Sequence, residues 1–249
     1  MKIALISQKI KWQDYEYNAK RVLHFANLAK QNGVELVIFP EMCLSGFCSE
    51  NRNFMQEDFV LNLIKNLPVD IVFGVGIKDN NKLYNRLYWL DTNSNIKASF
   101  DKLHAFRFGL EKDIELGNKL SNYNFNSINF GFGICYDLRF YESFGANANE
   151  CEIFIVPACW PKSRVYEWKT LLKARAIENQ AFFIGVNRDG VEPNLEYSNS
   201  SIVVLPNGRE LKPMYKKGEM AIYDIDINEV RQRRERFNTL TDRRFELLK

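Results

Sequence analysis

Histidine and paired cysteines are scarce in this chain of 249 residues. The histidines are His24 and His104, and the five cysteines include no Cys-x-x-Cys pair. Because zinc is usually held by several histidines or closely spaced cysteines, we predict no metal site, and we expect no cofactor. An odd number of cysteines without such pairs also argues against a disulfide framework and favours a reducing compartment.

Long apolar runs are missing as well. No stretch approaches the roughly 18 apolar residues that cross a bilayer. The apolar start at Ile3–Ser7 is too short for a signal peptide and is typical of a first strand. We therefore expect a cytoplasmic protein with no membrane partner.

The chain also lacks a strong excess of either charge. Lys and Arg number 34 and Asp and Glu 31, and a net charge of +3 does not predict a nucleic-acid partner. The basic run Arg231–Arg236 is interrupted by Glu235 and is typical of a solvated helix face. A tail that contacts nucleic acid there is a remote alternative.

The composition that remains is that of an ordinary globular protein. Hydrophobic residues make up 46% and charged residues 26% of the chain. A chain of 249 residues is long enough for one large core. We find no repeat, low-complexity segment or linker, so we expect a single domain over residues 1–249.

Short apolar runs alternate with amphipathic segments. Helices are predicted over Tyr15–Gln31, Phe54–Lys65 and Ser163–Asn179, with further starts near Leu138 and Asn228. Strands are predicted at Ile3–Ser7, Leu36–Phe39, Ile71–Ile77, Tyr84–Asp91, Lys97–Asp101, Asn129–Cys135, Ile153–Pro157, Phe182–Val186, Ser201–Leu205 and Met220–Ile225. Because both helical and hairpin connections join the strands, an α/β sandwich with mixed sheets is expected.

Two charged side chains follow predicted strands directly. Glu41 comes after the buried run Leu36–Phe39, and a carboxylate in that place is costly unless it is paired or used. Lys102 follows the strand Lys97–Asp101. Taken singly, each is more often a cap, a surface ion pair or a solvated side chain.

A cysteine follows a third predicted strand. Gly133 precedes Cys135 by two residues, and a helical pattern begins just after it. A turn from strand to helix exposes the thiol and points backbone N–H groups at whatever binds there, which suits a nucleophile. The alternative is a buried structural cysteine.

Together these segments resemble the nitrilase superfamily of carbon–nitrogen hydrolases, and most closely its omega-amidase-like branch. The resemblance extends from Lys2 to Arg244, and the ordered series is specific although no single block is. The matching blocks are Phe39–Glu41, Asp101–His104, Gly133–Phe140, Val156–Pro161, Leu171–Gln180, Val186–Arg188 and Asp242–Arg244.

The resemblance implies a fold and a reaction. The fold is a four-layer α-β-β-α sandwich with two mixed β-sheets, usually paired into a homodimer or higher homo-oligomer through a helical face. Cys135 would attack an amide carbonyl and form a thioester, with Glu41 as general base. Lys102 and the backbone N–H of Tyr136 would stabilise the oxyanion.

The resemblance also implies a second glutamate and a substrate pocket. Glu111 is the assigned second glutamate. Glu115 is its alternative, because the amino-acid sequence around the two residues departs from the family pattern. A substrate carboxylate could bind Arg139, four residues after Cys135, or Arg164, which follows Trp160-Pro161. Arg139 could instead form a structural ion pair with Asp137 or a helix carboxylate. Trp160 could wall the pocket or fill the core. Tyr136 is the remaining substrate-binding candidate.

Several functions fit this pattern. We predict hydrolysis of a small amide that also carries a carboxylate, such as 2-oxoglutaramate, with release of ammonia. An amidohydrolase for N-carbamoyl amines or amino acids is the nearest rival, and a nitrilase is a further one. A catalytically inactive interaction protein on the same fold is the alternative from another class. The intact Glu41, Lys102 and Cys135 argue against it. The other cysteines and His104 are interpreted as packing or supporting residues.

Overall fold

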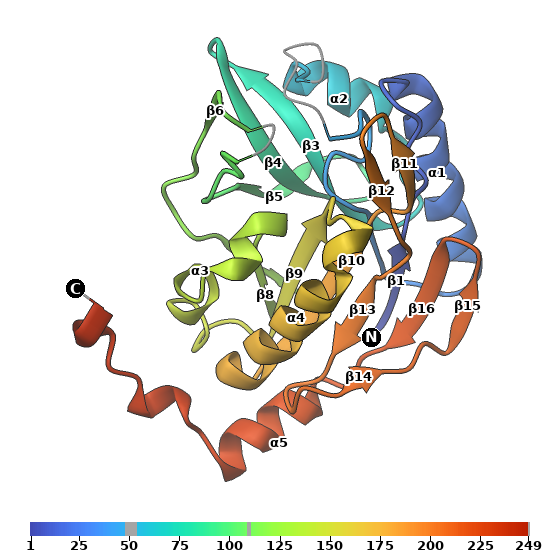
Figure 1. Ribbon diagram of the computed structural model, residues 1–249. Coiled ribbons are helices and arrows are strands. Elements are labelled where there is room, and N and C mark those ends of the chain that lie inside the picture. The colour runs from blue at the N-terminus through green and yellow to red at the C-terminus, as the bar shows by residue number, and fades with distance from the viewer. Residues whose placement is uncertain (48–53, 109–110, 249) are drawn as a thin grey trace.

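The computed structural model describes residues 1–47, 54–108 and 111–248; Cys48 lies outside them. Two large sheets form the centre of the molecule, and a two-stranded hairpin lies beside them (Figure 1). None of the helices in the described residues is long and apolar enough to span a bilayer.

The first sheet has eight strands in the order β15-β16-β1-β2-β3-β4-β5, with β6 paired to β4. The central strands β1, β2 and β3 are parallel, whereas β16 pairs antiparallel with β1, β4 with β3, and β5 with β4. The strands are β1 (Lys2–Ile6), β2 (Leu36–Ile38), β3 (Asp70–Asp79), β4 (Lys82–Leu90), β5 (Ile96–Asp101), β6 (Ile114–Glu115), β15 (Tyr215–Lys217) and β16 (Met220–Asp224).

The second sheet has six strands in the order β14-β13-β10-β9-β8-β7. Its strands β8, β9 and β10 are parallel, whereas β7 pairs antiparallel with β8, β13 with β10, and β14 with β13. These strands are β7 (Asn122–Phe125), β8 (Ile128–Phe132), β9 (Ile153–Ala158), β10 (Phe182–Asn187), β13 (Ile202–Val204) and β14 (Glu210–Leu211), and the hairpin is β11 (Gly190–Glu192) with β12 (Leu195–Tyr197).

Five α-helices and several 3-10 turns complete the described chain. The Asp14 carboxylate accepts a hydrogen bond from the Tyr17 N–H at 3.1 Å and so caps the start of the longest helix. The helices are α1 (Tyr15–Gln31), α2 (Glu57–Leu63), α3 (Glu142–Gly145), α4 (Val165–Asn179) and α5 (Asn228–Arg236), and the 3-10 turns are Cys135–Arg139, Lys162–Arg164, Leu240–Asp242 and Phe245–Leu248.

The layers follow from the alternation of side chains along the strands. Ile3 and Leu5 of β1 point into the core between the two sheets, whereas Ala4 and Ile6 point to the opposite face, which α1 and α2 cover. On the far side α4 packs against β10 (Figure 1). The predicted four-layer α-β-β-α sandwich with two mixed sheets is thereby confirmed.

The predicted bounds of a strand and a helix differ from those in the structure. The predicted strand Asn129–Cys135 ends at Phe132, because the chain turns into a 3-10 helix at Cys135. The predicted helix Ser163–Asn179 is divided into the 3-10 turn Lys162–Arg164 and α4. Beyond α5 the C-terminal segment extends away from the two sheets (Figure 1).

Candidate active site

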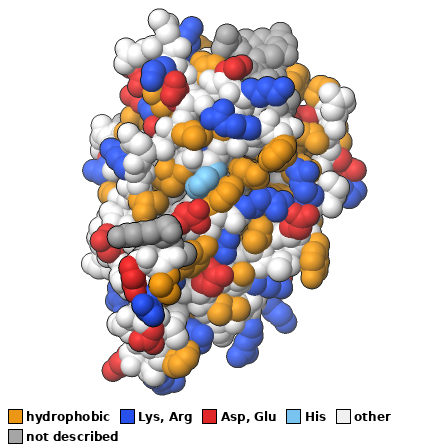
Figure 2. Space-filling model, turned by 60° about the vertical axis from the view of Figure 1, so that its left-hand side comes forward, with side chains coloured by type: hydrophobic (Ala, Val, Ile, Leu, Met, Phe, Trp, Pro, Cys, Tyr) orange, Lys and Arg blue, Asp and Glu red, His pale blue; other side chains and the backbone are white. Residues whose placement is uncertain are grey.

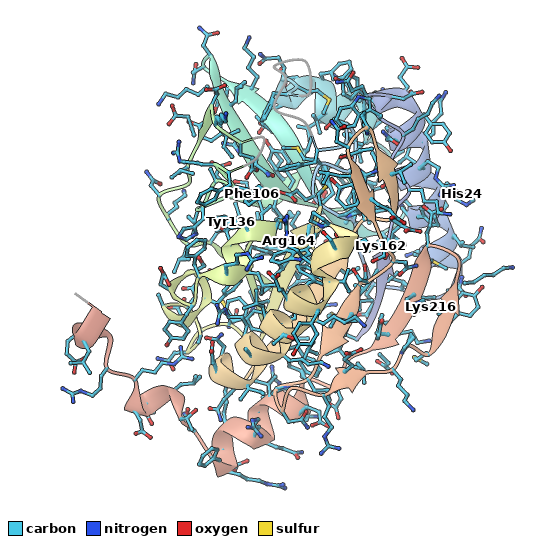
Figure 3. All side chains as sticks on the ribbon, in the orientation of Figure 1. His24, Phe106, Tyr136, Lys162, Arg164 and Lys216 are labelled. Atoms are coloured by element: carbon cyan, nitrogen blue, oxygen red, sulfur yellow. The ribbon has the colours of Figure 1, made fainter. Side chains whose placement is uncertain are left out.

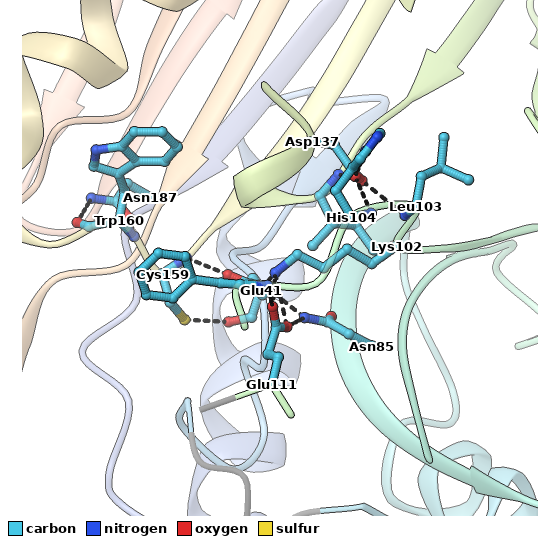
Figure 4. Close-up of polar contacts among 12 residues, drawn as sticks. Glu41, Asn85, Lys102, Leu103, His104, Glu111, Asp137, Cys159, Trp160 and Asn187 are labelled. Carbon is cyan, nitrogen blue, oxygen red and sulfur yellow. Dashed lines mark hydrogen bonds and ion pairs between the residues drawn. The ribbon is translucent and has the colours of Figure 1, made fainter. Parts of the chain in front are cut away.

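Three strand ends meet at one place between the sheets. Glu41 follows β2 and Lys102 follows β5 in the first sheet, and Cys135 follows β8 in the second. Their exposed fractions are 0%, 1% and 9%, and Lys102 and Cys135 line a cavity of about 300 Å³. The structure thus brings together three side chains that lie far apart in the sequence, two of which, Glu41 and Lys102, are labelled in Figure 4.

The backbone at Glu41 is held against β3. The N–H of Gly74 donates to the Pro40 carbonyl at 3.1 Å, and the Gly74 carbonyl accepts from the Cys43 N–H at 2.9 Å. A Cβ atom at Gly74 would lie 2.7 Å from the Glu41 Cα, so only glycine permits this approach. Met42 then adopts a left-handed conformation with φ of +49°. The strand end is therefore rigidly placed.

Three donors fix the Glu41 carboxylate. Its Oε1 accepts from Lys102 Nζ at 2.9 Å and from Asn85 Nδ2 at 2.7 Å. Its Oε2 accepts from the Cys159 N–H at 2.7 Å. Such contacts offset the cost of burying a charge and hold the carboxylate in one orientation (Figure 4).

A second buried carboxylate contacts the same lysine. Both oxygens of Glu111 lie 2.8 Å from Lys102 Nζ, and Glu111 also accepts from Asn85 Nδ2 and from the Phe106 N–H, each at 2.7 Å. Glu115, the alternative predicted from the sequence, is exposed and lies 3.5 Å from Lys82 Nζ. The structure brings Glu111, and not Glu115, to the site.

Charges in this network keep the lysine protonated. Burial alone would lower the pKa of Lys102, but the adjacent carboxylates of Glu111 and Glu41 outweigh that effect and raise it well above its ordinary value. An ammonium that stays charged is a suitable partner for a developing oxyanion.

Asn85 is a site residue that the sequence interpretation missed. It lies on β4 and donates to both carboxylates of the network. The signal was present, since Leu83, Asn85, Leu87 and Trp89 share the inward face of β4 and Asn85 is the polar residue in that apolar row. A buried amide there needs partners, as a strand-end carboxylate does.

The turn that carries Cys135 has a special backbone. Cys135 has a φ of +46°, which is uncommon outside glycine, and it begins the 3-10 helix Cys135–Arg139. A Cβ atom at Gly133 would lie 2.6 Å from the Phe144 ring, so glycine lets α3 pack closely beneath the turn. The predicted strand-to-helix turn is present, in a tighter form than expected.

Asp137 joins the cysteine segment to the lysine segment. Its carboxylate accepts from the N–H groups of Ile134 at 2.9 Å, His104 at 2.8 Å and Leu103 at 3.4 Å. His104 Nδ1 lies 3.0 Å from the same carboxylate, and the imidazole stacks on Phe140 at 3.8 Å between ring centroids. His104 is therefore a supporting residue behind Lys102. The contacts of Asp137 with Leu103 and His104 were not predicted, because those residues lie 34 and 33 positions away in the sequence.

The Cys135 thiol is surrounded so that it stays protonated at rest. Burial raises its pKa, the negative charge of Glu41 raises it further, and the Lys102 ammonium opposes both only in part. A neutral thiol is a weak nucleophile, so a base beside it is required for attack on a carbonyl.

The other described cysteines have different surroundings. Cys43 and Cys151 are fully buried, and burial raises the pKa of each thiol. Cys159 was predicted to be a packing residue, but it also lines the cavity and its N–H binds Glu41. Its Sγ donates to the Glu41 carbonyl oxygen at 3.1 Å.

Aromatic and basic side chains wall the cavity. Phe106 contacts Tyr136 at 5.2 Å between ring centroids, and the Arg164 guanidinium lies 5.5 Å from the Phe106 ring centre (Figure 3). Hydrophobic and basic side chains lie next to one another across the middle of one face of the surface (Figure 2). The lining residues are Phe47, Lys102, Phe106, Phe108, Cys135, Tyr136, Arg139, Cys159, Trp160, Pro161, Arg164 and Leu195.

Trp160 and Arg139 form one corner of the cavity. The Trp160 backbone N–H donates to Asn187 Oδ1 at 2.7 Å, and the indole Nε1 donates to the Arg164 carbonyl at 2.8 Å. The Arg139 guanidinium lies 4.9 Å from the Trp160 ring centre and pairs with Glu167 of α4. Of the two ion pairs considered from the sequence, the one with a helix carboxylate is present.

Histidine, cysteine and carboxylate side chains do not cluster in the manner of a metal centre anywhere in the described ranges. The site is built instead from two carboxylates, an ammonium, an amide and a thiol.

Comparisons with known proteins identify relatives of this chain. A "hydrolase in agr operon" from Staphylococcus aureus is 30% identical over 261 residues, covering 100% of both chains. A 2-oxoglutaramate amidase from Bacillus subtilis is 27% identical, covering 86% of each chain. A crystal structure from Xanthomonas campestris, described as a CN-hydrolase superfamily protein with an arsenic adduct in its active site, is 27% identical, with a TM-score of 0.85 over 98% of this chain and 97% of its own.

The sequence profile of the Carbon-nitrogen hydrolase family matches residues 2–235. Since that match includes all three strand ends that meet beside the cavity, this chain belongs to the carbon–nitrogen hydrolase family, the nitrilase superfamily that its sequence resembles.

Proposed function

We propose that this chain hydrolyses the C–N bond of small linear amides that carry a carboxylate, through a thioester on Cys135. The observation that supports this most is the buried network of Glu41, Lys102 and Glu111 beside a thiol that opens on a cavity. The relative named for 2-oxoglutaramate supports the choice of substrate class. Residues 1–249 would act as one domain, in the cytoplasm.

The first half of the reaction forms the thioester. Glu41 takes the proton from Cys135 Sγ, and the thiolate attacks the amide carbonyl carbon. The Lys102 ammonium and the Tyr136 N–H stabilise the resulting oxyanion. Glu41 then returns the proton to the leaving nitrogen, the C–N bond breaks and ammonia departs.

The second half releases the acid. A water molecule replaces ammonia, and Glu41 takes one of its protons as the oxygen attacks the thioester carbon. The carbon–sulfur bond breaks, the carboxylic acid leaves, and the proton returns to the sulfur. Glu111 positions Lys102 and Asn85 positions Glu41 throughout, and the Asn85 amide also joins the two carboxylates.

A homodimer is also proposed. Tyr166 and Ile177 on α4 are 83% and 48% exposed, and Phe237 after α5 is 64% exposed. Apolar side chains exposed on and near one helical face are typical of a surface that pairs with another chain. Such a dimer would use the face of α4 that points away from the sheets.

We expect iodoacetamide to modify Cys135 before the other four cysteines. Cys135 combines access to the cavity with a carboxylate that can accept its proton, whereas the Cys159 thiol donates to a backbone carbonyl, which is no base. Loss of activity should follow labelling of Cys135 with the same time course, measured by peptide mass mapping. Labelling of Cys43 or Cys159 first, with activity lost at that stage, would contradict the assignment.

Ammonia release across a panel of substrates tests the reaction class. Monoamides of short dicarboxylic acids should give the highest kcat/KM, above N-carbamoyl amino acids and nitriles. An N-carbamoyl amidohydrolase would instead release carbon dioxide together with ammonia, so both gases should be quantified. A panel in which only carbamoyl compounds or only nitriles react would overturn the proposal in favour of that rival.

A further inference from the structure

The positively charged side chains in and near the cavity differ in whether a carboxylate pairs with them. The Lys102 ammonium contacts two carboxylates, and the Arg139 guanidinium pairs with Glu167. Lys162, just outside the cavity, lies 2.6 Å from the Glu196 carboxylate. Arg164 differs, because no carboxylate of residues 1–47, 54–108 or 111–248 lies within 4.0 Å of its guanidinium.

The backbone of Arg164 is held by hydrogen bonds, and its side chain lines the cavity. Its N–H donates to the Pro161 carbonyl at 3.0 Å, and its own carbonyl accepts from the Trp160 indole at 2.8 Å. The guanidinium rests over the Phe106 ring, beside Tyr136 (Figure 3). An aromatic platform of this kind orients a guanidinium and leaves its N–H edge available to a ligand.

We propose that Arg164 is the residue that selects a substrate carboxylate, at the end of the substrate remote from the amide. This inference rests on the proposed amidase function and deepens it. A guanidinium binds a carboxylate through two parallel hydrogen bonds, and here the ligand would supply the negative charge that the described protein groups do not.

Arg139 has a different role, although it lines the same cavity. It already pairs with Glu167, lies over the Trp160 ring, and its carbonyl accepts from Arg175 Nη2 at 3.0 Å. A substrate carboxylate would have to compete with Glu167 for it. Arg139 is therefore a positioning residue that joins the turn after Cys135 to Trp160 and α4.

The test compares two amides of equal chain length, glutaramate with a terminal carboxylate and pentanamide without one. The measured quantity is the ratio of their kcat/KM values. Losing hydrogen bonds to a charged group should lower this ratio by about 10- to 150-fold in Arg164→Gln. Arg139→Gln should lower both kcat/KM values together and keep the ratio within about threefold, since it acts on the geometry shared by both substrates.

Lys162→Gln is the matched control, because it removes a positive charge two residues away that is paired outside the cavity. The ratio should not change in this variant. An unchanged ratio in Arg164→Gln, or a collapse of the ratio in Arg139→Gln instead, would overturn the inference while leaving the amidase function in place.

A binding measurement separates this inference from the proposed function. Glutarate, the product of glutaramate hydrolysis, should bind the wild-type protein by calorimetry, and its Kd should rise at least about tenfold in Arg164→Gln but not in Lys162→Gln. If no amide releases ammonia, the amidase function fails, yet the glutarate result still decides the role of Arg164. Equal glutarate affinity in all three proteins would refute that role.

Discussion

Replacing Cys135 with alanine is expected to lower kcat for the best amide substrate by at least about 10³-fold. The thiol forms the covalent bond in the proposed reaction, and the neighbouring Cys159 thiol donates to the Glu41 backbone carbonyl instead of to a carboxylate. Ammonia release under single-turnover conditions measures the effect. Folding should be retained, since the change removes one sulfur atom from a residue that is 9% exposed and lines the cavity.

Cys135→Ala also separates an enzyme from an interaction protein on the same fold. A binding module would keep its function in this variant, whereas a hydrolase loses turnover and keeps its affinity for the product. Cys151→Ala is the control, because Cys151 is fully buried away from the cavity. Full activity in Cys135→Ala would end the thioester mechanism.

The second large effect on kcat is expected from replacing Glu41, the proposed general base. Glu41→Gln is expected to lower kcat by about 10²- to 10⁴-fold, the range typical of a lost general base. The amide NH2 of glutamine would also face either the Lys102 ammonium or the Cys159 N–H, both of which are donors. Alkylation of Cys135 by iodoacetamide should slow in parallel, because the proton acceptor of the thiol is gone.

Glu115→Gln is the matched control for this change. Glu115 is exposed and contacts only the side chain of Lys82 among the described ion pairs, so activity should stay within about twofold, as for most surface substitutions. Thermal melting of Glu41→Gln shows whether the buried network has lost stability. Wild-type turnover in a folded Glu41→Gln protein would exclude Glu41 as the base.

The regular parts of this fold are strongly encoded in local sequence. Helix α1 has the predicted bounds Tyr15–Gln31, because one apolar face and the Asn32-Gly33 stop both mark it. The central strands β1, β2, β3, β9 and β10 have the predicted bounds within one or two residues, since their residues are largely apolar on both faces, whereas β8 ends three residues earlier than predicted. The short outer strands were missed; β15, for example, is exposed along Tyr215–Lys217 and carries no apolar pattern.

Contacts between distant segments were harder to predict. The sequence pattern predicted that Glu41, Lys102 and Cys135 follow strands, but only the family resemblance predicted that they lie in one site. Nothing local distinguishes Glu111 from Glu115, because only the path of the chain after Lys102 decides which carboxylate turns inward. Pairing of Arg139 with Glu167, 28 residues along the chain, likewise depends on how α4 docks.

The carboxylate of Asp137 has a consequence for how this chain tolerates insertions. It binds the backbone on both sides of the gap between the first and second sheets, at His104 and at Ile134. The distance between the Lys102 ammonium and the Cys135 sulfur is therefore set by the hydrogen bonds of Asp137. It does not depend on the length of the polypeptide between the two segments. Residues 118–121, which precede β7 between those anchors, can lengthen or shorten at the surface without moving the reacting atoms.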